Sequence, residues 1–248
     1  MRLKLISCEI FYREMCAAVA RSQNRVDIEF LPKGLHDIGT AGMHERLQTA
    51  LQQVDETNYD AVLFGYGICN NGVVGLQARS VPIVVPRAHD CITLFLGSKQ
   101  RYLDYFDAHT GVYFKSTGWI ERNDRGELRQ LSIQEQSGMD MSYEEMVAKY
   151  GEDNAKFLYE QLGDRTRNYG QLTFIEMGIE PDDSFEQHTR DEAREKGWEF
   201  EKMQGDLSLI QRFVDGQWDD AEFLVVPPGG RVVSSYDETI ITLEKDPS

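Results

Sequence analysis

Short apolar segments alternate with helical segments along the first third of the chain, and this pattern constrains the fold more than any other sequence feature. Four segments are predicted to be strands, at residues 2–7, 26–31, 60–65 and 82–86. The third, DAVLFG, is an unbroken apolar run, which is typical of a strand buried on both faces of a parallel sheet. Residues 10–22, 40–54 and 73–78 are predicted to be helical. The alternation predicts an α/β fold with a mainly parallel sheet of the Rossmann or flavodoxin type.

A second alternating unit is predicted near the carboxyl end of the chain. Its strands are expected at residues 171–177, 198–203 and 222–226, and its helices at residues 184–196 and 207–215. Residues 121–141 are polar and are predicted to be a linker or insertion. Ser142 and Glu145 have capping-box spacing, which predicts the start of a helix that continues in helical style at residues 153–162. We therefore expect two α/β lobes, at residues 1–120 and 142–248, with a ligand cleft between them.

Composition excludes several classes of partner. The formal net charge is −16, from 42 acidic and 26 basic residues, and such a surface repels nucleic acid and anionic membranes. The chain lacks the run of roughly 18 apolar residues that a membrane span requires. Its first residues, MRLKLISCEIFYREM, carry charges through the apolar stretch and do not have the pattern of a signal peptide. A cytoplasmic location and a small-molecule substrate are therefore expected.

All four cysteines lie in the first 91 residues. In a cytoplasmic protein they are not expected to form structural disulfides. Cys8, Cys69 and Cys91 each follow a predicted strand, whereas Cys16 lies inside a predicted helix and is interpreted as a core residue. This placement separates three candidate site residues from one structural residue.

The three strand-end cysteines are predicted to converge. Ligands of open α/β sheets bind beyond the carboxyl ends of the strands. In a 2-1-3-4 strand order the first, third and fourth strands are neighbours, about 4.8 Å apart. Thiolates favour zinc or iron–sulfur clusters, and three protein ligands with one open position is the pattern of catalytic zinc. We therefore predict a metal site at Cys8, Cys69 and Cys91, with zinc as the metal and a [4Fe–4S] cluster as the alternative. The simpler interpretation is three buried thiols that act as small hydrophobic groups.

Polar residues beside these cysteines are candidates for a fourth ligand, a hydrogen-bonding partner of a ligand or a proton carrier. They are Glu9, His89 and Asp90. The other histidines that the chain offers have no partner suggested by spacing and are interpreted as surface or structural residues: His36, His44, His109 and His188.

The segment GYGICNNGVVG follows the third predicted strand and is rich in glycine and asparagine. Backbone amides in such a turn can cradle an anion, so a cofactor-binding role is predicted for Gly67, Asn70, Asn71 and Gly72. A tight turn that needs positive φ is the compatible structural interpretation. The segment matches neither the Walker A nor the GxGxxG pattern, so a nucleotide is not predicted.

The segments SCE, GYGICNNGV and PRAHDCITLFLGS resemble a bacterial and archaeal family known as domain of unknown function 1638. The likeness extends to TGWIE, GDLSLIQRFVDG and FLVVPPGG. The resemblance implies no established activity, but members are often found alongside corrinoid-dependent methyltransferases. In addition, His89-Asp90-Cys91 is similar to the His-x-Cys zinc-binding pair of corrinoid-linked thiol methyltransferases.

The residues and the resemblance together lead to one expected function and two alternatives. The first is a metal-dependent enzyme of one-carbon or methyl-transfer metabolism, whose metal activates a thiol or another nucleophile of a small molecule. The second is a [4Fe–4S] enzyme that uses one iron as a Lewis acid. The third is a non-catalytic accessory protein that binds a metal or a corrinoid. A corrinoid protein or a methyltransferase is the expected protein partner.

Overall fold

The computed structural model describes residues 1–109, 111–122, 151–158 and 169–244, with the single positions 128, 144, 147 and 148. The linker expected at residues 121–141 and the capping box expected at residues 142–145 lie largely outside this part of the chain. Helix α8 (Glu152–Leu158) covers the described part of the helix expected at residues 153–162. None of the helices described is long and apolar enough to cross a membrane.

The larger sheet has five strands in the order β2-β1-β3-β4-β8. They are listed here in sheet order: β2 (Arg25–Leu31), β1 (Arg2–Cys8), β3 (Ala61–Gly65), β4 (Ile83–Pro86) and β8 (Phe223–Val226). The first four are parallel, and β8 is antiparallel to β4. The α/β fold and its mainly parallel sheet are thus confirmed, and β1, β3 and β4 are neighbours as the 2-1-3-4 order requires.

A smaller parallel sheet has three strands, β5 (Val112–Lys115), β6 (Gln171–Glu176) and β7 (Glu199–Gln204), in that order. A separate antiparallel hairpin joins β9 (Val232–Ser234) to β10 (Ile241–Leu243). Strands from the two expected lobes pair with each other. Strand β5 of the first expected lobe pairs with β6 of the second, and β4 of the first pairs with β8 of the second. The division into lobes at residues 1–120 and 142–248 stays a prediction.

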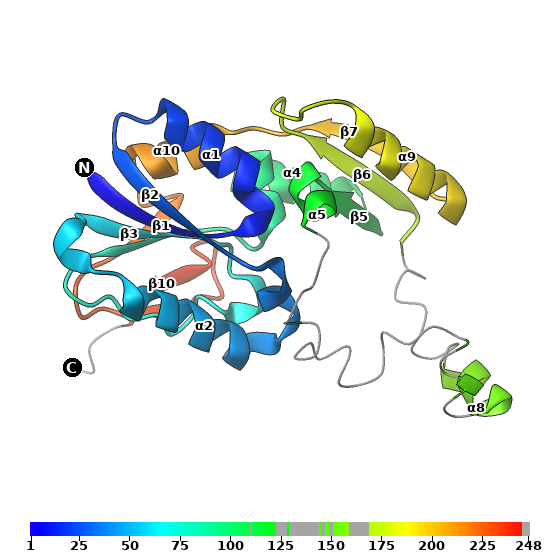
Figure 1. Ribbon diagram of the computed structural model, residues 1–248, viewed down its shortest axis with the longest axis horizontal. Helices are drawn as coiled ribbons and strands as arrows, with labels where there is room; N and C mark the ends of the chain where they lie inside the picture. Colours follow the sequence, from blue (N-terminus) through cyan, green and yellow to red (C-terminus); the bar gives the residue numbers. More distant parts are fainter. Residues whose placement is uncertain are drawn as a thin grey trace.

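Helices cover both faces of the larger sheet (Figure 1). Helices α1 (Tyr12–Arg21) and α10 (Ser208–Asp215) lie side by side on one face, and α2 (Gly39–Gln53) lies on the other. Alternate residues of β3 enter the two cores, with Leu63 on the α1 side and Phe64 on the α2 side. This two-sided burial explains why β3 is apolar throughout.

The first core also joins the two sheets. Phe95 lies in α3 (Cys91–Leu96), and Ile175 in β6 belongs to the same buried cluster as Leu63. The backbone N–H of Asp206, which follows β7, donates to the carbonyl oxygen of Phe95 at 2.8 Å. The described parts of the two sheets therefore share a continuous apolar core.

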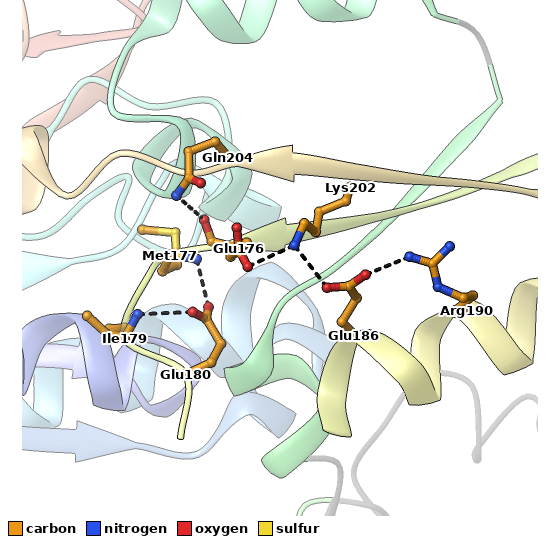
Figure 2. Close-up of polar contacts among 8 residues, drawn as sticks. All are labelled: Glu176, Met177, Ile179, Glu180, Glu186, Arg190, Lys202 and Gln204. Carbon is orange, nitrogen blue, oxygen red and sulfur yellow. Dashed lines mark hydrogen bonds and ion pairs between the residues drawn. The ribbon is translucent and has the colours of Figure 1, made fainter. Parts of the chain in front are cut away.

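Helix α9 (Ser184–Lys196) is attached to all three strands of the smaller sheet. Figure 2 shows Lys202 of β7 between two carboxylates, Glu176 of β6 and Glu186 of α9, each 3.0 Å from its Nζ. Glu192, further along α9, forms an ion pair with Lys115 of β5. Exposed ion pairs each contribute little free energy, and two of these pairs join α9 to β5 and to β7.

Gly118 controls how α5 (Thr117–Glu121) packs. A Cβ atom at this position would lie 1.7 Å from the carbonyl oxygen of Ile10, which lies in η1 (Glu9–Phe11), the 3₁₀ turn after β1. No side chain can be accommodated there without moving one of the two elements. Gly118 therefore allows α5 to contact η1 directly.

We expect Gly118→Ala to lower the free energy of unfolding by about 2–3 kcal/mol, because overpacking displaces backbone that cannot yield. Urea unfolding measures the change. Gly170→Ala is the matched control, since a Cβ there meets no atom within 4 Å. We expect the control to alter stability by less than about 1 kcal/mol. Equal stability of the two variants would contradict the close packing of α5 on η1.

Candidate functional site

Cys8, Cys69 and Cys91 line one cavity at the carboxyl edge of the larger sheet. Cys8 is the last residue of β1, Cys69 is the first residue of η4 (Cys69–Asn71) after β3, and Cys91 is the first residue of α3 after β4. Because β1, β3 and β4 are adjacent and parallel, their carboxyl ends meet at the same edge. The structure thus brings the three cysteines together from three successive strand ends.

The cavity has a volume of about 30 Å³ and mainly apolar walls. Besides the cysteines and Gly67, its lining consists of Ile10, Phe11, Lys33, Leu35, His36, Met43, Tyr66 and Trp119. A cavity needs roughly 10–15 Å³ by this measure to hold a water molecule, so about 30 Å³ is sufficient. The cavity therefore has room for an ion or a water-sized group.

Burial raises the pKa of each cavity thiol. The pKa of Cys8 rises to about 12 and that of Cys69 to about 11, because surrounding protein atoms exclude the solvent that stabilises a thiolate. The pKa of Cys91 is raised well above its usual value for the same reason. Each residue is still partly accessible. The three thiols are therefore neutral near pH 7 unless a bound group stabilises their anions.

Two buried polar groups on the cavity wall have no hydrogen-bond partner among the described residues. They are the hydroxyl of Tyr66 and the indole nitrogen of Trp119. The Trp119 side chain lies close enough to Cys91 to favour its thiolate, without reaching hydrogen-bond geometry. Leaving a buried polar group unpaired costs about 1–3 kcal/mol. Unpaired groups around a cavity are typical of a site that holds water, an ion or a ligand.

No three Cys, His, Asp or Glu side chains in the described part of the chain are already arranged to hold a metal ion. Zinc–sulfur bonds are about 2.3 Å long, so binding requires the thiol side chains to turn toward a common centre. The zinc site, and the [4Fe–4S] alternative, stay predictions.

Glu9, His89 and Asp90 adjoin the cavity cysteines in sequence but are not among the residues that line the cavity. Glu9 accepts a hydrogen bond at 2.8 Å from the backbone N–H of Lys33. His89 stacks on the ring of Tyr102, 5.9 Å away between centroids. The catalytic role predicted for Glu9, His89 and Asp90 stays a prediction.

Asp90 holds the start of α3 in place. Its carboxylate caps the helix by accepting hydrogen bonds from the backbone N–H groups of Ile92 and Thr93, at 2.9 and 3.3 Å. It also accepts a hydrogen bond from the hydroxyl of Tyr102 at 3.0 Å. Asp90 therefore positions Cys91, the residue that follows it.

The glycine-rich segment forms a tight turn. Asn70 and Asn71 have positive φ values of 49° and 57°, and the side-chain amide of Asn70 donates to the carbonyl oxygen of His36. A Cβ on Gly67 would lie 2.8 Å from backbone atoms of Asp90, and one on Gly72 would lie 2.4 Å from the Met43 side chain. Close approach and positive φ therefore account for this sequence. An anion or cofactor at these four residues stays a prediction.

Four residues of the cavity wall with a polar side-chain group were not predicted as site residues: Lys33, His36, Tyr66 and Trp119. His36 was interpreted as a surface or structural residue, and its side chain is half exposed while it also lines the cavity. Tyr66 and Trp119 belong to the distinctive segments GYGIC and TGWIE. Their position in those segments is one sequence signal that marked them, and Trp119 also belongs to an aromatic-rich stretch interpreted as core or as an aromatic wall for a flat ligand.

The fold and the cavity define this chain as an α/β protein with a three-cysteine site at the carboxyl edge of its larger sheet. Its sequence matches the family described as "Protein of unknown function (DUF1638)" over residues 30–214, and the chain belongs to that family. The match includes Cys69, Cys91 and Trp119, whereas Cys8 precedes it. No curated protein and no solved structure matches the chain.

The raised thiol pKa values predict how the cysteines react. Below the pKa, the thiolate fraction and the rate of alkylation by iodoacetamide rise about tenfold for each pH unit. In protein freed of metal by a chelator, we expect Cys8 and Cys69 to follow this slope from about pH 7 to about pH 10, and mass spectrometry of the labelled peptides measures it. Cys16, which does not line the cavity and whose pKa burial also raises, is the internal control. Labelling of Cys8 and Cys69 near pH 7 as fast as in unfolded protein would contradict their burial.

Proposed function

We propose that this protein is a metal-dependent enzyme that acts on a small molecule, with one ion held by Cys8, Cys69 and Cys91. The observation that carries the proposal is the convergence of the three cysteines on one ion-sized cavity at the carboxyl ends of β1, β3 and β4. This edge is where open α/β sheets bind their ligands.

The unpaired polar groups favour a functional site over a plain hydrophobic core. Buried cysteines alone are compatible with a core, because a free thiol packs as a small apolar group. The hydroxyl of Tyr66 and the N–H of Trp119 are not, because each is buried without a hydrogen-bond partner among the described residues. An anionic ligand or a metal-bound anion in the cavity would accept both hydrogen bonds.

Zinc is the metal that we propose, and a [4Fe–4S] cluster is the alternative. Three thiolates with an open fourth position form a known type of catalytic zinc site.

The chain's own residues would bind and orient the reacting group. When bound, zinc supplies Lewis acidity that lowers the pKa of a coordinated thiol or water. Tyr66 and Trp119 would then donate hydrogen bonds to the resulting anion. His36, half exposed at the cavity wall, would transfer the released proton to solvent. Transfer of a one-carbon group, with a corrinoid protein or methyltransferase as partner, is the reaction class we propose from the family resemblance.

Metal analysis tests this function. Protein purified without oxygen is expected to contain about one equivalent of zinc per chain, because all three thiolates surround a single cavity. Cys69→Ala removes one of three ligands and is expected to reduce the zinc content at least about tenfold. Cys16→Ala is the matched control, since Cys16 is a free cysteine that does not line the cavity.

Three results would decide against the proposal as stated. Folded wild-type protein with much less than about half an equivalent of any metal would refute the metal site. Full metal content in Cys69→Ala would refute the three-thiol arrangement. Iron and sulfide in place of zinc, with brown colour, would establish the cluster instead.

A further inference from the structure

A second, larger cavity adjoins the three-cysteine cavity. Its volume is about 320 Å³, and its walls are Lys33, Tyr113, Phe114, Lys115, Trp119, Ile120 and His188. These residues come from η2 (Lys33–Asp37), β5, α5 and α9, so the cavity lies where the carboxyl edge of the larger sheet meets the smaller sheet. A volume of this size falls in the range of small-molecule sites, about 300–1,000 Å³.

The two cavities share Lys33 and Trp119 as lining residues. The Nζ atom of Lys33 lies 4.2 Å from the centroid of the Trp119 ring and donates a hydrogen bond to the Trp119 carbonyl oxygen at 3.3 Å. This cation–π pair therefore forms a partition between the larger cavity and the thiols. A molecule in the larger cavity lies directly beside the three-cysteine cavity.

The lining of the larger cavity is basic in an acidic protein. The chain has 42 acidic and 26 basic residues, yet this wall contains two lysines and a histidine and no acidic residue among those described. A cavity that concentrates cationic groups against the overall charge attracts anions. Aromatic side chains occupy much of the remaining wall, and one of them, Tyr113, is 39% exposed.

Lys115 can bind an anion without leaving a carboxylate unpaired. Its present partner is Glu192, which does not line the cavity. Glu192 also forms an ion pair with Lys196, whose Nζ lies 3.3 Å from its Oε1. When Lys115 turns toward a ligand, Lys196 continues to neutralise Glu192.

We propose that the larger cavity binds a small organic anion with a flat, apolar body. The anionic group would interact with Lys33 and Lys115, because lysine ammonium groups bind carboxylates and phosphates by charge-assisted hydrogen bonds. The flat body would pack against Trp119 and Tyr113, as aromatic rings pack on one another. As the substrate site of the metal-dependent enzyme this cavity rests on the proposed function, whereas anion binding itself does not.

Calorimetric titration of the full chain with naphthoate, and separately with naphthamide, tests the proposal. The two probes have the same flat body and differ in charge. We expect naphthoate to bind at least about tenfold more tightly than naphthamide, and its affinity to fall as salt is added. Equal affinity of the two probes, or no binding of naphthoate, would overturn the proposal.

Lysine variants locate the site. Lys115→Met is expected to weaken naphthoate binding at least about tenfold, and Lys115→Arg is expected to retain it because the charge remains. Lys196→Met is the matched control, since it removes the other partner of Glu192 and the same charge but leaves the cavity wall intact. Equal losses in Lys115→Met and Lys196→Met would overturn the assignment to this cavity.

The result of the naphthoate titration can be distinguished from the result of the metal analysis. Naphthoate binding with the expected variant pattern in protein that holds no metal would refute the proposed enzyme and leave the anion site established. Full zinc content with no discrimination between the two probes would refute the anion site and leave the metal site established.

Discussion

Parallel pairing of β1, β3 and β4 is the interaction on which the rest of the structure depends. Leu5 pairs with Leu63, and Val62 pairs with Ile83, so the three strands run together and end at the same edge. Gly65, the last residue of β3, allows the ends of β3 and β1 to lie close together, because a Cβ there would lie 2.5 Å from the Ser7 hydroxyl oxygen. The site therefore needs only short loops, and the cysteines meet because the sheet register places their strand ends side by side.

Local patterns were sufficient for the parallel strands of the larger sheet and for the convergence of the cysteines. The helix predicted at residues 73–78 is wrong, because these residues form turns and a bridge between Gln77 and Arg231. Apolar runs identified β1, β3 and β4, and the general rule for open α/β sheets identified the edge where ligands bind. The same patterns did not identify the partners of β5 and β8. An apolar segment of four residues fits either sheet, and the choice depends on long-range packing that no short segment encodes.

The roles of the polar residues at the site were also only partly predictable from the sequence. Glu9 and Asp90 accept hydrogen bonds from backbone N–H groups, because carboxylates near turns and helix starts readily cap them, and their role beside the thiols stays a prediction. Lys33 and Trp119 reach the cavity from η2 and α5, which are distant from the cysteines along the chain. Their contribution depends on tertiary packing, including the approach of Gly118 to Ile10, and spacing carries no information about it.

Glu9 and Gly118 together position the Lys33–Trp119 pair, which lines both cavities. Glu9 follows Cys8 and holds the backbone of Lys33, whose side chain lies over the Trp119 ring. Gly118 lets α5 approach the turn after β1, which places Trp119 beside the thiols. The end of β1 is therefore connected to the larger cavity through one chain of contacts, Glu9 to Lys33 to Trp119. Displacement of Lys33 from the indole ring would therefore alter the walls of both cavities.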